Sequence, residues 1–364
     1  MKNIATLAAA LGLAAGAVQA GSIQRDNDRS QILFEPGKNY LEFSVVNFTG
    51  EISGTGTGAV IPFLAGSRSG NIFQNYQSYG LAYKYQYNEQ LTFAVVANNP
   101  VGADVAYPIS PYIFSGSTAE ITSLAVTGYV KYRFNENISA YAGVRAQRLD
   151  GSVDLISSLA GSYALNVSPD YSFGYVLGAA YEIPDIAMRV ALTYESKIEH
   201  DFRDNNGTPF EVEIPQAVTL HARTGISPTM LVFGSIRWQE WTQFEVAPAD
   251  FSTPSALNPG GLPIAFGTDD FWTYEIGLGR KFSENWSGAV TVGYENDGGV
   301  PVGNLEGKDG YVSYGISAKY STEAYDISLG LKYFDLGSAT TTTIASDFSG
   351  NHALGVGAKI GWRF

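Results

Sequence analysis

The side chains with the most evident chemistry in this 364-residue chain are cations set inside otherwise apolar segments. They alternate with apolar residues at a period of two, the β-strand period, so they face away from the apolar side of each segment. Cations on one face could hold an anionic group such as a carboxylate. The simpler interpretation is a solvated interior in which they pair with Glu and Asp. The candidate ligand-binding residues are Lys131, Arg133, Arg145, Arg189, His221 and Arg223.

Residues that could support catalysis are few. The chain has three histidines and no cysteine, which excludes disulfides, thiolate catalysis and Cys-ligated metals. His200 beside Asp201 could serve a surface hydrolase only if an outward-facing nucleophile joined it. A phosphate-binding glycine loop is not evident. We therefore predict that the protein is not an enzyme and has no cofactor and no metal.

The elements that must position these residues are clearest at the carboxyl terminus. Residues 352–364 alternate between an apolar face that ends in two aromatics and a face that is small or cationic. The apolar face consists of Leu354, Val356, Ala358, Ile360, Trp362 and Phe364. This ending resembles the last strand of bacterial outer-membrane β-barrels, in which a final aromatic is the usual assembly signal. Phe364 is therefore the candidate assembly signal.

The same alternation recurs along the chain and predicts about fourteen long strands in an all-β fold. The segments are 38–48, 76–87, 90–98, 120–134, 138–149, 171–182, 186–202, 215–225, 229–244, 270–282, 286–297, 310–320, 324–336 and 352–364. Short connections near residues 88, 135, 185, 227, 283 and 321 alternate with long ones at 49–75, 99–119, 150–170, 203–214, 245–269, 298–309 and 337–351. Aromatic residues gather at the short-turn ends, where a membrane girdle would lie. The pattern favours an antiparallel transmembrane β-barrel over a soluble sandwich.

Composition and the first residues indicate export. Lys2, an Ala- and Leu-rich run and the Val18-Gln19-Ala20 ending are typical of a secretory signal peptide, which we predict at 1–20. Residues 21–37 would be a short amino-terminal hatch or tail, and 38–364 the barrel. The net charge of −13 argues against a nucleic-acid surface.

The predicted long loops are unusually apolar for exposed segments. Such clusters often mark binding sites, although they could also pack on one another over the barrel mouth. The loop at 150–170 could contain one helical turn. The candidate ligand-capture residues are Ile61, Phe63, Leu64, Ile156, Leu159, Leu262 and Phe266.

Residues 100–104 follow the third predicted strand directly. Pro100 cannot donate to a strand ladder and Gly102 weakens one, so pairing is disturbed there. In a barrel wall this could be a side opening; an ordinary loop start is the alternative. We predict a lateral opening at Pro100, Gly102 and Asp104.

Several stretches are similar to one known family. They are LTFAVVANNPVGADVAY at 91–107, YRFNENISAYAGVRAQR at 132–148, IAMRVALTYESKIEH at 186–200, PQAVTLHARTGISPTMLVFGSIRWQEWTQF at 215–244 and FSENWSGAVTVGY at 282–294. Together, over residues 34–364, they resemble the long-chain fatty-acid transporter (FadL/OMPP1/TodX) family of outer-membrane proteins. The resemblance implies a fourteen-stranded barrel plugged by an amino-terminal hatch. It also implies ligand capture at the extracellular loops, passage into a lumenal pocket and exit sideways at a kink in the third strand.

The chain departs from the family in one respect. The segment at 21–37 is shorter than the usual plug and lacks its typical Asn-Pro-Ala start, which leaves gating by the hatch open. We expect passive uptake of hydrophobic molecules, such as long-chain fatty acids, across the bacterial outer membrane. The expected partners are that ligand, outer-membrane lipids and lipopolysaccharide, and the barrel-assembly machinery. A general porin for small polar solutes is the alternative.

Overall fold

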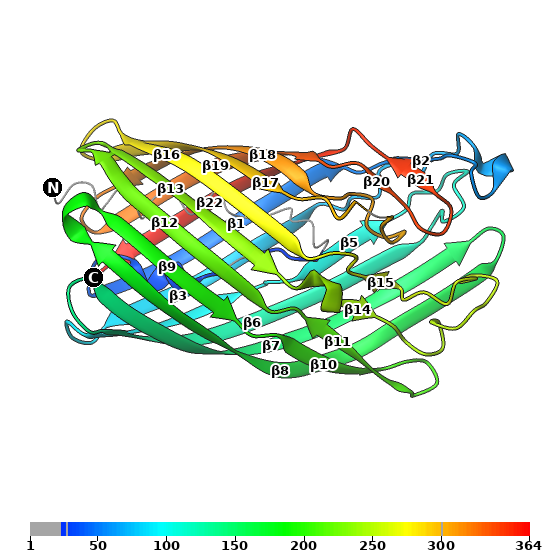
Figure 1. Cartoon of the computed structure of the whole chain (residues 1–364), viewed down its shortest axis with the longest axis horizontal. Helices are drawn as coiled ribbons and strands as arrows, with labels where there is room; N and C mark the ends of the chain where they lie inside the picture. Colours follow the sequence, from blue (N-terminus) through cyan, green and yellow to red (C-terminus); the bar gives the residue numbers. More distant parts are fainter. Residues whose placement is uncertain (1–22, 27, 300) are drawn as a thin grey trace.

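A single closed antiparallel barrel dominates the computed structural model, which describes residues 23–26, 28–299 and 301–364 (Figure 1). The wall has 14 strands, as the alternation predicted. Short turns lie at one end and long loops at the other, with the carboxyl terminus at the short-turn end (Figure 1). The predicted signal peptide at 1–20 lies outside the described residues.

The wall strands follow one another around the barrel in chain order. They are β1 (Asn39–Glu51), β3 (Tyr76–Gln86), β4 (Leu91–Asn98) continued by β5 (Gly102–Ala106), β6 (Thr118–Arg133), β7 (Ile138–Ser157), β8 (Gly161–Ile183), β9 (Met188–Glu195), β12 (Ala217–Ser227), β13 (Met230–Gln239), β16 (Phe271–Lys281), β17 (Trp286–Glu295), β18 (Tyr311–Ser321), β19 (Tyr325–Leu336) and β22 (His352–Arg363). Pairing of β1 with β22, from Tyr40 opposite Arg363 to Glu51 opposite His352, closes the sheet.

Smaller elements cover the long-loop end. They are the sheet of β2 (Gly54–Gly56), β20 (Ala339–Thr340) and β21 (Ser346–Phe348), the hairpin β10 (Ile198–Arg203) and β11 (Pro209–Ile214), the pair β14 (Glu245–Val246) and β15 (Ala265–Phe266), and the 3-10 turns η3 (Pro62–Leu64) and η5 (Trp241–Gln243). The 3-10 turn η4 (Pro184–Ile186) forms one short turn at the opposite end. No helix within the described ranges combines the length and the apolar character needed to cross a membrane.

Exposure in the wall is the reverse of that in a water-soluble protein. Leu329 on the outer face is 60% exposed, whereas Lys84 on the inner face is 2% exposed. The aromatics at the short-turn end, among them Phe282 and Trp286, are exposed on the outside. An apolar exterior with aromatic ends and a polar interior is the pattern of a barrel solvated by lipid.

The inner wall is held by charge pairs. Lys332 lies 2.5 Å from Glu275, and Lys359 lies 3.2 Å from Glu42. Glu195 accepts hydrogen bonds from Arg145 at 2.7 Å and from Arg237 at 2.5 Å. Because these groups are buried, each charge needs its partner to offset the loss of water.

Two predicted segments differ from the structure around the third long loop. Strands β7 and β8 extend well beyond 149 and 171, and only residues 158–160 connect them, so the predicted loop at 150–170 is wrong. No helical turn forms there, because Leu155, Val153 and Leu165 bury alternate side chains against the loops. The predicted strand 186–202 is two strands, since the chain leaves the wall after Glu195 and returns through the β10–β11 hairpin.

The terminal residue lies at the seam of the barrel. The Phe364 carbonyl accepts a hydrogen bond from the Asn39 side-chain amide at 2.7 Å, and its ring is 70% exposed and stacks on Tyr83 at 6.5 Å. This position leaves the ring on the outer surface at the short-turn end. Recognition of Phe364 by the assembly machinery stays a prediction.

The described amino-terminal residues lie inside the barrel. Residues 30–34 form the 3-10 turn η2 (Ser30–Phe34), in which Ser30 and Leu33 are buried. Asp28 accepts hydrogen bonds from Thr193 of β9 at 2.7 Å and from the Ser30 side chain at 2.8 Å. The described part of this segment is therefore bound to the inner face of the wall and is not a tail outside the barrel.

Candidate functional site

The wall is interrupted where the third strand bends inward, between β4 and β5. Pro100 has no N–H, and its carbonyl accepts hydrogen bonds from the backbone of Arg25 at 2.8 Å and Asp26 at 3.2 Å. The Gly102 N–H donates to the Ile23 carbonyl at 2.6 Å. At this bend the third strand forms backbone hydrogen bonds with the amino-terminal segment instead of with β3.

Gly102 leaves room for the Arg25 side chain, which a larger residue at this position would force to move. A Cβ on Gly102 would lie 2.5 Å from the Arg25 guanidinium carbon. That guanidinium also pairs with Asp104, two residues further along β5. The three residues predicted to form a lateral opening, Pro100, Gly102 and Asp104, are therefore all contacts of the amino-terminal segment.

The bend leaves a short gap in the wall between β3 and β5. Residues 72–74, just before β3, rejoin β5, where the Ala106 N–H donates to the Ile72 carbonyl at 3.0 Å and Phe73 pairs with Val105. Strand β3 pairs with β4 only from Gly80 onward, whereas β5 pairs as a strand only with β6 among the described residues. The Asn99 side chain fills part of the gap: its oxygen accepts the Tyr79 N–H at 2.9 Å, and its nitrogen donates to the Gln77 carbonyl at 3.1 Å. Asn99 therefore takes the place of a missing strand residue.

Replacing Asn99 with alanine should unfasten β3 locally. The Tyr79 N–H and the Gln77 carbonyl would lose their partner, and unpaired backbone groups at membrane depth cost free energy. This edge of β3 would therefore separate from the wall more often and exchange its amide hydrogens with water. Hydrogen exchange followed by mass spectrometry should show faster exchange in peptides that contain Tyr79. Asn135→Ala, in a turn at the other end, should leave those peptides unchanged, and unchanged exchange in Asn99→Ala would contradict this role.

Three cavities lie in a row under the long loops. The loop cavity, of about 50 Å³, is lined by Phe114, Leu155, Phe251, Leu257, Leu262 and Phe266 among others. The central cavity, of about 90 Å³, is lined chiefly by Leu149, Leu165, Val167, Phe202, Phe210 and Val212. The gap cavity, also about 90 Å³, reaches Ile23, Arg25, Ile72, Tyr76, Gly102 and Asp104.

Shared residues connect these cavities. Leu305 lines all three, Ile264 lines the loop and central cavities, and Ala265 lines the central and gap cavities. The cavities therefore form a row from the loops to the gap in the wall, with Leu305 beside each of them. Leu305 belongs to the loop at 296–310, and no periodic pattern in the sequence had drawn attention to it.

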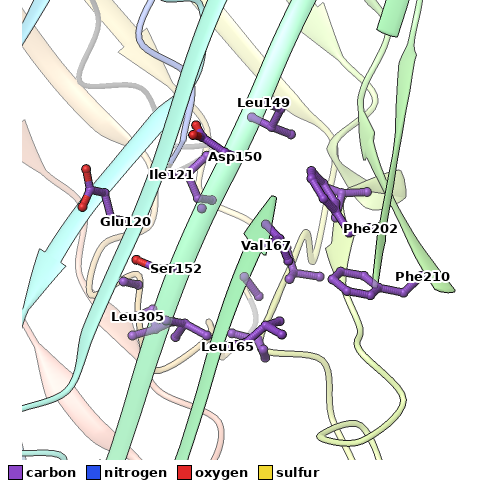
Figure 2. Close-up of a pocket in the computed structure, with 17 residues that line it drawn as sticks. Glu120, Ile121, Leu149, Asp150, Ser152, Leu165, Val167, Phe202, Phe210 and Leu305 are labelled. Atoms are coloured by element: carbon purple, nitrogen blue, oxygen red, sulfur yellow. The ribbon is translucent and has the colours of Figure 1, made fainter. Parts of the chain in front are cut away.

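The central cavity is apolar on the side of the β10–β11 hairpin. Figure 2 shows Phe202 and Phe210 of the hairpin facing Val167 of β8, with Leu305 and Leu165 below them. The carboxyl groups of Glu120 and Asp150 lie on the side away from the two phenylalanines (Figure 2). Asp150 pairs with Arg148 at 2.6 Å, so the cavity offers a bound molecule chiefly apolar surface.

The six predicted ligand-binding residues do not converge on these cavities. Arg145 is paired with Glu195, and Arg133 donates to the Asn135 carbonyl of a short turn at 3.2 Å. His221 lies 3.4 Å from Asp28 of the amino-terminal segment. These three side chains have protein partners, which are carboxylates for Arg145 and His221, as the simpler interpretation expected, and a backbone carbonyl for Arg133.

The other three form a cluster at the short-turn end. Lys131 and Arg189 each lie 4.2 Å from the Phe34 ring, on which both make cation–π contacts. Lys131 also donates to the Leu33 carbonyl at 2.7 Å. Arg223 stands opposite Arg189 in the β9–β12 register and has no hydrogen-bond or ion-pair partner among the described residues. We call Lys131, Arg189 and Arg223 the lumen cation cluster.

The seven predicted capture residues are dispersed. Leu262 and Phe266 line the loop cavity, and Leu64 is buried with Ile61 packed nearby in a loop cluster. Phe63 is 72% exposed at the tip of the first loop. Ile156 belongs to β7 rather than to a loop, and Leu159 is exposed in the short β7–β8 turn.

Comparison with known proteins identifies the family. A family model described as outer membrane protein transport protein (OMPP1/FadL/TodX) matches residues 46–298, which is more than half of the chain. The chain belongs to this family. A search of curated protein sequences found no match.

Solved structures of the OMPP1/FadL/TodX family share the fold. A Pseudomonas aeruginosa FadL homologue is 16% identical, with a TM-score of 0.72 over 97% of this chain and 98% of that one. The Pseudomonas putida toluene transporter TodX is 13% identical, with a TM-score of 0.66 over 96% of each chain. The Ralstonia pickettii toluene transporter TbuX is 13% identical, with a TM-score of 0.60 over 91% of this chain and 90% of that one.

Membership of the OMPP1/FadL/TodX family confirms the predicted location in the bacterial outer membrane. In such barrels the short turns face the periplasm and the long loops face outward. The three cavities therefore lie under the extracellular loops, and the lumen cation cluster lies near the periplasmic end. Family members are transport channels, which agrees with the prediction that the chain is not an enzyme.

The histidine considered for hydrolysis has a different partner in this family member. His200 Nδ1 lies 2.9 Å from the Asp170 carboxylate of β8, whereas Asp201 is on the other face of β10. The His200 side chain is on the buried face of the β10–β11 hairpin. It is therefore not an exposed base beside Asp201, as a surface hydrolase would require.

Proposed function

We propose that this protein carries small, uncharged hydrophobic molecules across the outer membrane by passive diffusion. The observation that supports this most directly is the row of three cavities between the extracellular loops and the gap in the wall, of which the central one offers almost entirely apolar surface. Burial of apolar surface at about 25 cal/mol per Å² is enough to draw such a molecule from water into the row.

The proposed route ends at the side of the barrel. A molecule would enter at the loop cavity near Leu262, pass Leu305 into the central cavity and reach the gap cavity beside Gly102. There the bend between β4 and β5 separates the third strand from β3. Exit through this gap would deliver a hydrophobic molecule into lipid and spare it the polar lumen below.

Cavity size favours a ligand about as large as one aromatic ring. An apolar cavity of roughly 150 Å³ accepts benzene. The central and gap cavities hold about 90 Å³ each, so together they can take one ring or a short part of an acyl chain. Glu120 lines the central cavity and has no ion-pair partner among the described residues, so its carboxylate disfavours a second carboxylate there.

Long-chain fatty acids are the second candidate, and the lumen cation cluster favours them. Arg223 stands opposite Arg189 and makes no ion pair with the described residues, although Glu182 lies 3.9 Å from Arg189. Planar guanidinium groups suit carboxylates. The cluster is at the periplasmic end, so a fatty acid would have to pass the segment at 23–37 to reach it. That route would use the lumen instead of the side gap.

A general porin is disfavoured by the amino-terminal segment. Residues 21–37 are proposed to act as a fixed plug, because the described part is bonded to β9 through Thr193 and to the bend through Pro100. A porin needs a water-filled lumen. Planar-bilayer recordings should therefore show little steady conductance; a large ohmic conductance would support the porin.

Uptake assays test the ligand class. Cells that lack their own hydrophobic channels would express this chain, and uptake of labelled toluene and labelled oleate would be compared with uptake by vector-only cells. We expect faster toluene uptake with the chain. Oleate uptake alone would favour the second candidate, and no gain with either molecule would overturn the proposal.

A further inference from the structure

His200 is a fully buried polar side chain whose second ring nitrogen is unused. Its side chain is 0% exposed, and Nδ1 is bound to the Asp170 carboxylate at 2.9 Å. Nε2 has no hydrogen-bond partner in the part of the chain that the structure describes. A buried polar atom without a partner is uncommon in native proteins and calls for a physical reason.

The residues around His200 line the central cavity. Val212 is its cross-strand neighbour in the hairpin, and Phe202 stacks on its ring at 6.3 Å from the next position on the same face of β10. Leu149 is the register partner of Asp170 on β7. Val212 and Phe202 line the cavity, as does Leu149 beside Asp170, whereas His200 does not, so the imidazole lies next to residues that form the apolar wall.

The hydrogen bond to Asp170 determines whether Nε2 of His200 is a hydrogen-bond donor or an acceptor. A carboxylate only accepts, so Nδ1 carries a proton and donates it. Burial lowers the pKa of His200 below its usual value, although the hydrogen bond and charge of Asp170 oppose this effect. The ring is then neutral at pH 7, and Nε2 presents a lone pair that accepts a hydrogen bond.

We propose that His200 Nε2 is a ligand-recognition site for hydrophobic molecules that carry one hydroxyl group, such as phenols and alkanols. The apolar body of the ligand would occupy the central cavity and the adjoining part of the gap cavity, and its O–H would donate to Nε2 after a small movement of Phe202. This inference rests on the proposed function, because it names the chemical class that the central cavity selects. It also explains why a histidine fixed by Asp170 is placed in an otherwise apolar wall.

Binding of p-cresol and toluene to the purified protein in detergent tests the proposal. The two molecules have similar shapes and differ by one hydroxyl, so their difference in affinity isolates the hydrogen bond from apolar burial. We expect the protein to prefer p-cresol by about three- to tenfold, after correction for partition into micelles, which is the usual net value of one hydrogen bond. Chains labelled with ¹⁵N-histidine contain only three such residues, and p-cresol should shift the unprotonated ring nitrogen of His200.

Two substitutions separate recognition from structure. His200→Asn can keep a donor for Asp170 but removes Nε2, and should abolish the preference for p-cresol while toluene still binds. Asp170→Asn can donate to Nδ1 and so place the proton on Nε2, which should shift the preference toward the acceptor p-methylanisole. His352→Asn, on the exposed rim, is the matched control and should behave like the unmodified protein.

The possible results distinguish failure of the His200 site from failure of the proposed transport function. If toluene and p-cresol bind equally and the His200 signal does not move, this inference is wrong while the proposed function stands. If neither molecule binds, the central cavity is not a ligand site and the proposed function fails with it. Loss of the preference in His200→Asn together with its reversal in Asp170→Asn supports the site.

Discussion

Replacement of Leu305 by tryptophan should reduce toluene uptake at least about tenfold. Leu305 lines the loop, central and gap cavities, so one larger side chain at this position would fill space in all of them. Forcing extra atoms into a packed site costs roughly 1–3 kcal/mol, and each 1.4 kcal/mol is a factor of ten in occupancy. Leu305→Ala should have the opposite effect, because it widens the connection between the cavities.

Initial uptake rates in whole cells measure this effect, with barrel content checked by the heat-dependent mobility of the folded protein on gels. Leu159→Trp is the matched control, since it makes the same chemical change at an exposed turn. Uptake that is normal in a correctly folded Leu305→Trp variant would show that the ligand does not pass this row of cavities.

The loop that contains Leu305 is fixed to its surroundings. Asn304 donates to Thr343 at 2.7 Å, and the Asp309 carboxylate accepts the Gly298 N–H at 2.8 Å. These bonds hold Leu305 at the junction of the cavities in spite of its place in a long loop. The tryptophan would therefore lie in the cavities instead of swinging out into solvent.

The wall of the barrel was predictable because lipid on one side and a polar lumen on the other impose a strict period of two. Every predicted wall segment corresponds to a strand, and the short turns lie where the sequence placed them. The break between β9 and β10 was not predicted, and neither were the ends of β7 and β8, because above the membrane the apolar residues of these two strands face the loops instead of lipid. Alternation cannot distinguish these two surroundings.

The sequence of the β10–β11 hairpin contains turn residues that predict a hairpin. Asn206-Gly207 is a turn signal, and Gly207 adopts a φ of +79° at the end of the three-residue loop that the bond from the Asp204 N–H to the Thr208 carbonyl closes. Read together with the alternation of Ile198, His200 and Phe202, it would have placed these side chains on one buried face. The central cavity and the setting of His200 follow from that hairpin.

The binding cations and the cavities were less predictable for a physical reason. A cation on the lumen face can pair with the wall, as Arg145 does with Glu195, or with the amino-terminal segment, as His221 does with Asp28. Strand period fixes which way a side chain points but not its partner across the lumen. Residues of irregular loops, such as Leu305, have no period at all, so only the folded chain shows where they meet.

Glu195→Gln should be among the most destabilising single changes in the barrel. Glu195 is 5% exposed and bridges Arg145 at 2.7 Å and Arg237 at 2.5 Å, so its loss removes a carboxylate that two buried guanidinium groups share. Removing one partner of a buried ion pair typically costs roughly 3–5 kcal/mol. The free energy of unfolding, from guanidinium titration of the protein in lipid vesicles, should fall by about that amount.

Two comparisons identify the cause of this loss. Glu199→Gln removes a carboxylate that pairs with Lys197 at 2.5 Å, but both side chains are about half exposed, so the titration midpoint should hardly move. Adding Arg237→Met to Glu195→Gln removes one of the two buried positive charges that Glu195 balanced, and should restore part of the lost stability. Glu195→Gln and Glu199→Gln could instead unfold at the same denaturant concentration. That result would show that the buried bridge does not stabilise the barrel, and that water in the lumen solvates Arg145 and Arg237 when Glu195 is absent.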